Sequence, residues 1–401
     1  MRKIILILKN EVVLVVATIL AVLSAFLIHP DKKYLDYVDF RTLGLLFCLM
    51  AVMGGFQRLG LFRQIAEGLL RRVGRNSIRV VLVLVLLAYF FSMLITNDVG
   101  LITFVPFTFT VLELLGEKEK NRLVIPVVVL ETIGANLGSM LTPIGNPQNL
   151  YLYGKAGLGV GGFLLLMLPY TALAGIMLVI CCILIGKGGE KAQPSTQEGA
   201  PSKEGQEDVN PLAEKSTAAY QTDRSKLALL VLYGVLFLIS LLTVANIVEY
   251  PVTLGITAAA ILLFDRKTLG KVDYFLLLTF VAFFVFIGNM GRIPAFSNFL
   301  ASIVVGREVP VAILASQAIS NVPAALLLSG FSNNYRELII GVNLGGMGTL
   351  IASMASLISY KYVAKLIPDK KGKYFGCFTA LGCLFLAVLL LGYYGLRGLG
   401  L

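Results

Sequence analysis

The chain has 401 residues, of which 57% are hydrophobic and only 14% are charged, and its mean hydropathy is +0.84. Apolar runs such as 11–28 and 163–185 approach or reach the roughly 20 residues that span a bilayer. This composition excludes an ordinary soluble domain and indicates a multi-pass membrane protein. The net charge of +11 does not indicate nucleic-acid binding, because most Lys and Arg residues lie in short loops, where they set membrane orientation.

The N-terminus resembles a signal peptide in having Arg2, Lys3 and Lys9 before an apolar stretch. No small-residue cleavage site follows before Asp31, so we expect a retained first helix. The chain carries 5 cysteines, all inside apolar segments, and their spacing matches no metal motif. They are expected to be packing residues, with soft ligation of arsenic or a metal as the alternative. No cofactor is expected beyond a coupling ion.

Hydropathy predicts nine membrane-spanning segments. They cover 11–29, 41–57, 123–152, 163–185, 227–245, 251–265, 273–290, 338–358 and 375–396. Two further apolar stretches, 77–115 and 309–331, each carry a polar break in the middle and are interpreted as re-entrant hairpins. The stretch 61–73 has apolar residues at helical spacing opposite arginines, which predicts a helix along the inner membrane surface.

The segment 186–226 differs in kind, because it is rich in Gly, Pro, Ser, Gln, Glu and Lys and has few large apolar residues. It cannot bury enough surface to fold, so we expect a flexible linker. The sequence thus divides into five parts. They are an N-terminal transmembrane helix with its outer loop (1–37), a first repeat (38–185), a flexible cytoplasmic linker (186–226), additional helices (227–271) and a second repeat (272–401).

The repeat is clearest where residues 133–144 align with residues 340–351 without a gap, so that an Asn-Gly-Thr pattern occurs twice in apolar sequence. Two further blocks align in the same order: 38–40 with 272–274, and 92–97 with 316–321. Most of the 34 Lys and Arg residues fall in inside loops if the N-terminus is cytoplasmic, and the two halves then run in opposite directions. The predicted fold is therefore an all-α polytopic membrane protein with two inverted-topology repeats, two re-entrant hairpins and two broken transmembrane helices.

Broken helices and hairpin tips leave backbone groups free at membrane depth, and in transporters such places hold the substrate and its coupling ion. Pro143 and Pro147 support a true helix break, because each removes a backbone donor. We expect the substrate or ion site to comprise residues from both hairpin tips and both breaks. These are Thr96, Asn97, Asp98, Thr142, Gly145, Asn146, Asn149, Ser320, Asn321, Thr349, Ala352 and Ser353.

Asp98 and Glu131 are the acids inside the apolar sequence that we expect to bind the coupling ion. Ionisable groups in a membrane are costly and usually mark ion or proton pathways. No Lys or Arg in the same segments is an evident partner, so a proton or cation is the expected counter-charge, with Na⁺ near Asn97 and Gly145 as one location. For Glu131 the alternative is an ion pair near the inner interface, for example with Arg122.

At the sequences Thr96-Asn97-Asp98, Thr142 to Asn149 and Ser320 to Pro323, the chain resembles the ion-transporter superfamily. This group includes citrate transporters, arsenite permeases, NhaD-type sodium/proton antiporters and, more distantly, divalent-anion/sodium symporters. The Asn97-Asp98 pair looks closer to the arsenite-permease and NhaD branch than to the dicarboxylate branch. The resemblance implies a scaffold part and a moving transport part, homodimers in the bilayer and elevator-type alternating access.

The function expected from these observations is secondary transport of a small anion or oxyanion, citrate- or dicarboxylate-like or arsenite-like, coupled to H⁺ or Na⁺. A sodium/proton antiporter is the alternative within transport. A membrane enzyme is the alternative outside it, but the sequence has one His and lacks HExxH, Gly-x-Ser-x-Gly and a P-loop. A partner ATPase stays open, since some arsenite permeases are thought to work with one. The expected location is the inner (cytoplasmic) membrane.

Overall fold

The computed structural model describes residues 11–71, 76–187 and 224–399, and within them the regular structure is helical with no strand. Six helices are long and apolar enough to cross a membrane, or seven if the bent pair α15–α16 counts as one. The six are α4 (Phe40–Arg58), α8 (Glu117–Gly138), α10 (Val160–Lys187), α12 (Arg224–Val244), α14 (Tyr274–Gly291) and α20 (Lys371–Gly398). The prediction of an all-α polytopic membrane protein is confirmed. The predicted linker 186–226 lies almost entirely outside the described residues.

Two of the predicted spans form short helices. α2 (Val12–Leu27) has 16 residues and α13 (Tyr250–Phe264) has 15, fewer than the roughly 20 that cross a bilayer. α2 packs against α14, and α13 packs against α4, so each short helix lies beside a long one.

Both predicted broken helices are broken at the expected residues. The first consists of α8, the short 3₁₀ turn η1 (Ser139–Leu141) and α9 (Pro147–Ala156). The second consists of α18 (Tyr335–Gly345), η4 (Leu350–Ala352) and α19 (Met354–Leu366). Pro147 occupies the first turn of α9, where the fixed φ of proline favours a new helix.

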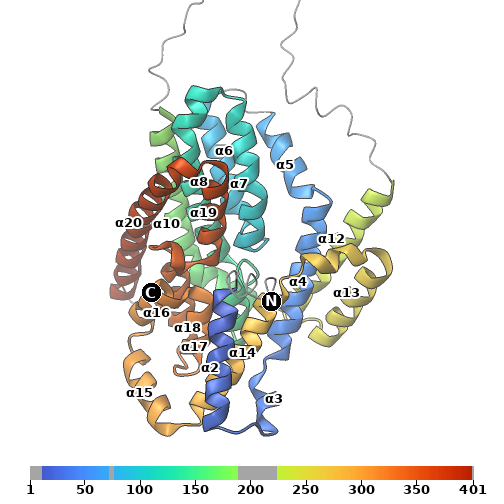
Figure 1. The fold of residues 1–401 in the computed structure, drawn as a ribbon, viewed down its shortest axis with the longest axis vertical. Helices are drawn as coiled ribbons and strands as arrows, with labels where there is room; N and C mark the ends of the chain where they lie inside the picture. Colours follow the sequence, from blue (N-terminus) through green and yellow to red (C-terminus); the bar gives the residue numbers. More distant parts are fainter. Residues whose placement is uncertain (1–10, 72–75, 188–223, 400–401) are drawn as a thin grey trace, which may run out of the picture.

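The two predicted hairpins are helix pairs with a polar turn between them. α6 (Ser77–Phe91) and α7 (Asn97–Glu113) form the first pair, and α16 (Glu308–Ile319) and α17 (Asn321–Ser329) form the second. The first pair lies in the upper part of Figure 1 and the second in the lower part, with both turns toward the middle. This placement agrees with an inverted arrangement, but re-entry from opposite membrane faces stays a prediction.

The predicted surface helix over 61–73 corresponds to α5 (Leu61–Leu70), whose Phe62, Ala66 and Leu70 are buried along one face. The second half has a counterpart, α15 (Pro294–Val304), that we did not predict. The remaining short elements are α3 (Lys33–Tyr37), η3 (Arg266–Lys271) and η5 (Pro368–Lys370).

Close packing follows the same pattern in the two halves. A Cβ added to Gly138 would lie 2.5 Å from Oγ of Ser92, and one added to Gly345 would lie 2.7 Å from Oγ of Ser316. Gly138 aligns with Gly345, and Ser92 with Ser316. Only glycine lets the broken helix approach the first hairpin helix so closely. The matched contacts support the predicted repeat.

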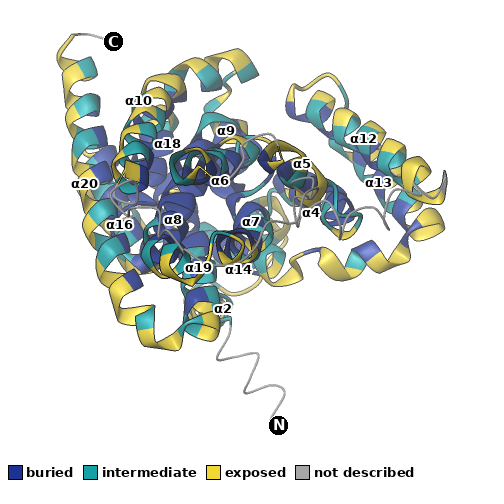
Figure 2. Ribbon diagram, turned by 90° about the horizontal axis from the view of Figure 1, so that it is seen from above, coloured by how far each residue is buried: buried dark blue, intermediate teal, exposed yellow. Residues whose placement is uncertain are grey.

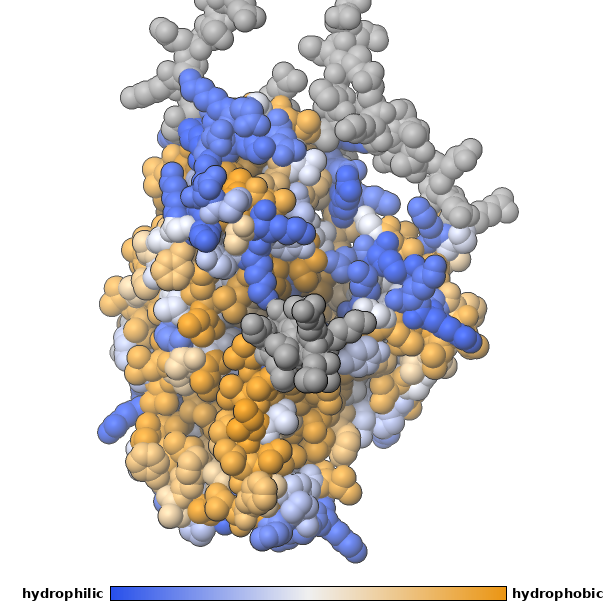
Figure 3. Space-filling view, viewed as in Figure 1, coloured by the Kyte–Doolittle hydropathy of each residue, from blue (hydrophilic) through white to orange (hydrophobic). Residues whose placement is uncertain are grey.

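The centre of the molecule is formed by the broken helices. Seen from above, α8 and α18 are largely buried, whereas α12, α13 and α20 lie at the edges with exposed residues facing outward (Figure 2). The outward residues of α12 and α20 include exposed apolar side chains, such as Leu238 and Leu391. On the face seen in Figure 3, apolar residues cover the middle of the molecule, and hydrophilic residues gather at its top and bottom. Exposed apolar surface of this extent fits contact with lipid.

Candidate functional site

The two broken helices are joined by two matching hydrogen bonds. Nδ2 of Asn136, in α8, donates to Oγ of Ser356, in α19, at 3.0 Å. Nδ2 of Asn343, in α18, donates to Oδ1 of Asn149, in α9, at 2.7 Å. Asn136 aligns with Asn343, and Asn149 with Ser356, so the second bond repeats the first with the halves exchanged. The two breaks are therefore held together at one central place.

Each hairpin tip contacts the break of its own half. The backbone N–H of Asn97 donates to the carbonyl oxygen of Gly145 at 3.3 Å, and Oγ of Ser320 donates to the carbonyl oxygen of Ala352 at 3.5 Å. Gly145 and Ala352 are equivalent in the repeat. Ser320 adopts φ +72, which is uncommon for a residue with a side chain and is typical of strained functional positions.

Asn136 also connects the first tip to the second break. Its Oδ1 accepts hydrogen bonds from Nδ2 of Asn97 at 2.9 Å and from Oγ of Ser353 at 2.8 Å. Together with the bond to Ser356, the Asn136 side chain has three partners, and it is 6% exposed. One buried amide thus fixes the relative position of three segments.

A narrow pocket lies among the two tips and the two breaks. Its volume is about 10 Å³, enough for about one water molecule or a bare ion. Polar side chains from all four segments line it: Asn97, Asp98, Asn146, Gln148, Asn321 and Ser353. Five of these six were predicted from the sequence, and Gln148 was not.

Several polar atoms at this place are buried and have no hydrogen-bond partner. They include Oδ1 of Asp98 and both side-chain polar atoms of Gln148, a residue that is 1% exposed. Buried polar atoms in proteins are nearly always paired, and an unpaired one is costly. Asp98 offers a carboxylate oxygen to a cation or proton, while Gln148 offers both a donor and an acceptor to a ligand.

Four helices begin at the site. α7, α9, α17 and α19 have Thr96, Asn146, Ser320 and Ser353 as their N-cap residues, and no N-cap side chain bonds to its own helix. The first N–H groups of a helix lack intrahelical partners and carry the positive end of the helix dipole. Four such ends around one pocket favour the binding of a negatively charged group.

The other predicted site residues lie just outside the pocket. Asn149 donates to the carbonyl oxygens of Ser139 and Thr142 at 3.2 Å, so it stabilises the first break. Oγ1 of Thr142 donates to the carbonyl oxygen of Met93 at 2.5 Å. The backbone N–H of Thr349 donates to Oε1 of Gln317 at 2.9 Å. The side-chain Oγ1 of Thr349 is buried and has no hydrogen-bond partner.

Glu131 lies apart from the pocket, in the buried part of α8. Oγ1 of Thr108, in α7, donates to one carboxylate oxygen, and the other oxygen has no partner. The alternative of an ion pair with Arg122 is wrong, because Arg122 pairs with Glu119 at 2.6 Å. Among the residues that the structure describes, Glu131 takes part in no ion pair.

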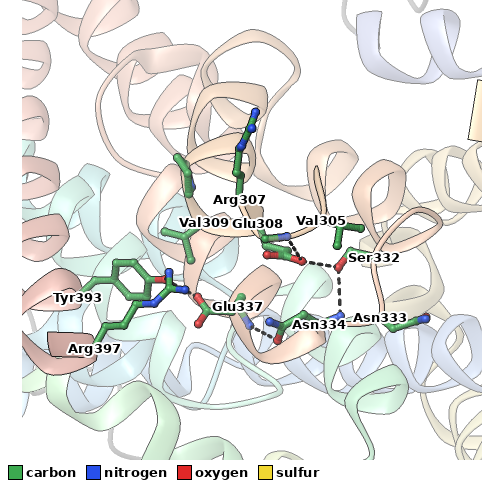
Figure 4. A pocket seen from close by; sticks show the side chains of 12 residues that line it. Val305, Arg307, Glu308, Val309, Ser332, Asn333, Asn334, Glu337, Tyr393 and Arg397 are labelled. Carbon is green, nitrogen blue, oxygen red and sulfur yellow. Dashed lines mark hydrogen bonds between the residues drawn. The ribbon is translucent and has the colours of Figure 1, made fainter. Parts of the chain in front are cut away.

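A separate polar pocket of about 340 Å³ lies near the base of the second hairpin (Figure 4). Oε1 of Glu308 accepts hydrogen bonds from the backbone N–H of Gly306 and from Oγ of Ser332, and Glu337 accepts one from Tyr393. None of the predicted site residues lines it. The bonds of Glu308 tie together the loops that precede α16 and α18, and the bond of Glu337 ties α18 to α20.

Sequence reasoning missed Asn136, Gln148, Asn343 and Ser356. Asn136 and Asn343 were aligned in the repeat but were not assigned to the site. Ser356 is the equivalent of Asn149, which was assigned. If the alignment of the two repeats had been applied to every polar residue of the breaks, it would have identified Asn136, Asn343 and Ser356, but not Gln148.

Comparison with known proteins identifies the family. The family model described as "Citrate transporter" (CitMHS) matches residues 4–333. Inner membrane protein YbiR of Escherichia coli is 32% identical over 345 residues, covering 84% of each chain. An uncharacterized transporter of Methanocaldococcus jannaschii is 32% identical over 337 residues, again covering 84% of each chain.

A silicon efflux transporter of Oryza sativa is 37% identical over 161 residues, which cover 39% of this chain and 31% of that protein. The family match extends from the first helix through the second hairpin, and the match to YbiR covers most of both chains. The resemblance to the ion-transporter superfamily is confirmed, and this multi-pass membrane protein belongs to the citrate transporter family CitMHS.

Proposed function

We propose that the protein is a secondary active transporter that moves a small anion or oxyanion across the cytoplasmic membrane, coupled to H⁺ or Na⁺. The observation that carries the proposal is the pocket at which two helix breaks and two hairpin tips meet. It is lined by Asn97, Asn146, Asn321 and Ser353 and surrounded by four helix N-termini. Side-chain amides and helix N-termini provide donors for an anion without a fixed positive charge in the pocket.

Coupling is assigned to Asp98. Its unpaired Oδ1 lies at the pocket that Asn97 also lines, so a cation or proton there would neutralise the carboxylate beside the bound anion. The carbonyl oxygen of Gly145 accepts one hydrogen bond, from Asn97, and a carbonyl oxygen has two lone pairs. Na⁺ near Asn97 and Gly145 therefore stays part of the proposal.

An elevator-type movement fits the arrangement of the helices. α4, α5, α12 and α13 form a group at one side of the molecule, beside the bundle that contains α8 and α18 (Figure 2). The first group supplies a scaffold, and the bundle carries the narrow pocket. This division supports movement of the site past a fixed part, and a homodimer through scaffold helices belongs to the same proposal.

Transport by purified protein in liposomes tests the proposal. Imposed pH and Na⁺ gradients are combined with citrate, dicarboxylates, sulfate and arsenite, and silicic acid is included because one relative is named a silicon efflux transporter. We expect concentrative uptake of at least one anion or oxyanion under one of the two gradients. Movement of Na⁺ against H⁺ with no anion transported would replace the proposal with a sodium/proton antiporter.

A further inference from the structure

A larger cavity adjoins the narrow pocket. It has a volume of about 270 Å³ and lies between α4, α7, α9 and the segment 270–276. We call it the side cavity, and Gln57, Thr96, Asp98, Asn146, Lys271 and Asp273 contribute its polar lining. Asp98 and Asn146 line both spaces, so the side cavity lies next to the narrow pocket.

Three helix N-termini face the side cavity. Its lining includes Thr96, Asn146 and Asp273, the N-cap residues of α7, α9 and α14. In α7 the N–H groups of Asn97 and Asp98 are already bonded, to the carbonyl oxygen of Gly145 and to Oδ1 of Asn97, and α9 begins with Pro147, which has no N–H, so these two ends contribute mainly the positive end of their helix dipoles. Unlike an isolated helix end, these termini surround a cavity that can hold a ligand.

Lys271 supplies the positive charge of the side cavity. It is exposed, and no ion pair in the described ranges includes it. Its stem is held against α4, because a Cβ added to Gly54 would lie 2.6 Å from Cβ of Lys271. Lys271 thus lines the cavity close to α4, and no acidic residue of the described ranges forms an ion pair with it.

The two carboxyl groups in the lining have other roles. Asp273 accepts a hydrogen bond from the backbone N–H of Leu276 at 2.9 Å and caps α14, where its charge is balanced by the helix dipole. Asp98 is the acid assigned to the coupling ion. With a proton or cation on Asp98, the formal charges of Lys271 and Asp273 cancel, and the positive helix ends then favour an anion in the cavity.

The equivalent place in the other half has a tyrosine instead of this lysine. Lys271 aligns with Tyr37, just as Gly54 aligns with Gly288. A Cβ added to Gly288 would lie 2.3 Å from the ring of Tyr37, whose hydroxyl oxygen accepts a hydrogen bond from Arg292 at 3.1 Å. The repeat therefore keeps the packing and changes the chemistry, with a lysine on one side only.

We propose that the side cavity is a second anion-binding site, which collects a small carboxylate or oxyanion and presents it to the narrow pocket. Lys271 is its attracting charge and selects for anions. The inference rests on the proposed function, since the anion gathered there is the one to be carried. Its test, however, measures the local electrostatics and needs no transport.

The test uses a reporter cysteine inside the side cavity, in a protein whose five native cysteines have been replaced. Ile102 lines the cavity and is 40% exposed, so Ile102→Cys is accessible to reagents. The rates of labelling by an anionic and a cationic methanethiosulfonate are measured on the detergent-purified protein. Citrate is then added as the probe, and the concentration that halves the labelling rate is recorded.

Lys271→Gln should lower the ratio of anionic to cationic labelling rates about fourfold. A unit charge about 10 Å away through water changes the local concentration of a monovalent ion about twofold, in opposite senses for the two reagents. The citrate concentration for half-protection should rise about threefold or more, because citrate carries several charges. Lys271→Arg keeps the positive charge, so its labelling ratio and its citrate protection should equal those of the protein that retains Lys271.

Lys267→Gln is the matched control, since Lys267 is an exposed lysine of the same turn, η3, and does not line the side cavity. It should leave the ratio and the protection unchanged. If Lys271→Gln leaves the ratio of anionic to cationic labelling rates unaltered, or if Lys267→Gln lowers that ratio equally, the inference is overturned. Neither result would contradict the proposed function. Responses of the expected size in a protein that transports no anion would support the binding site and contradict the proposed function.

Discussion

Asn136 donates a hydrogen bond to Ser356 across 220 residues of sequence, at a distance of 3.0 Å. The equivalent pair, Asn343 and Asn149, makes the same link in the opposite direction at 2.7 Å. The two halves of the chain therefore bind each other reciprocally at the centre of the molecule. A site built in this way needs both halves in place.

Asn136→Ala should weaken both folding and transport. It removes the partner of Asn97, Ser353 and Ser356, and each buried polar group left unpaired costs about 1–3 kcal/mol. We expect a lower thermal unfolding midpoint and at least about a tenfold loss of uptake. Ser356→Ala, which leaves the other two bonds intact, should show a smaller effect on both. Equal effects of the two substitutions would contradict the bridging role of Asn136.

The inverted topology is tested with two cysteines in a cysteine-free background. Lys118 and Asn333 are exposed residues near the bases of the first and second hairpins. Lys118→Cys should react with a membrane-impermeant thiol reagent only from inside, and Asn333→Cys only from outside, because the basic residues place the first loop in the cytoplasm. Reaction of both cysteines from one face would contradict the inverted arrangement.

Two ion pairs link the halves at equivalent positions, and they differ in burial. Arg58 pairs with Asp265, whose side chain is 5% exposed, whereas Arg292 pairs with Asp31, whose side chain is 39% exposed. Asp265 follows α13, outside the helix. Burial raises the pKa of this carboxyl, but hydrogen bonds from Tyr233, Arg58 and Thr268 outweigh burial, and its pKa is lowered from the ordinary value.

Asp265→Asn should therefore destabilise the protein by about 1–3 kcal/mol at neutral pH. A lowered folded-state pKa gives stability that is present above the unfolded value of about 3.9 and is lost as the pH falls through the folded value. The difference from wild type should then shrink below about pH 4. Asp31→Asn, at the exposed pair, should cost at most about 1 kcal/mol. Thermal unfolding of wild type and both variants across this pH range checks these expectations. If the stability lost in Asp265→Asn grew as the pH fell, the lowered pKa of Asp265 would be contradicted.

The repeat and the helix breaks could be predicted because they depend on residues with strong local effects. Pro143 and Pro147 remove two backbone donors within five residues, and aligned Asn, Gly and Thr residues are rare in apolar sequence. The helix α15 was missed because its 11 residues are too few to span a membrane and lie between the predicted span 273–290 and the predicted hairpin 309–331. Hydropathy placed α2 and α13 within two residues of their observed bounds.

The candidate site could be predicted as far as the tips and the breaks, but not in its connections. Asn136 lies inside a regular helix, and only the fold brings Asn97, Ser353 and Ser356 to it. Gln148 has no polar equivalent in the second half, where Ala355 occupies its position. Side chains that act through long-range contacts leave little trace in local sequence.

Asp98→Asn should separate substrate exchange from coupling. The change keeps the size and hydrogen bonding of the side chain while removing the charge that would hold H⁺ or Na⁺. Counterflow of substrate in liposomes should continue, but accumulation driven by a gradient should be lost. Asp36→Asn, on an exposed segment, is the control and should accumulate substrate as wild type does. Unchanged accumulation with the same pH and Na⁺ dependence would make Asp98 structural, and Glu131 would be tested next.

The central claim is that the substrate binds between the two hairpin tips and the two breaks. Substrate uptake into liposomes by Asn97→Ala and Asn321→Ala tests it most directly, with Asn333→Ala as the control at an exposed asparagine in a different pocket. At equal protein in the membrane and similar unfolding midpoints, we expect both tip variants to lose uptake and counterflow and the control to keep them. Wild-type uptake by either tip variant would remove that residue from the site and contradict the account.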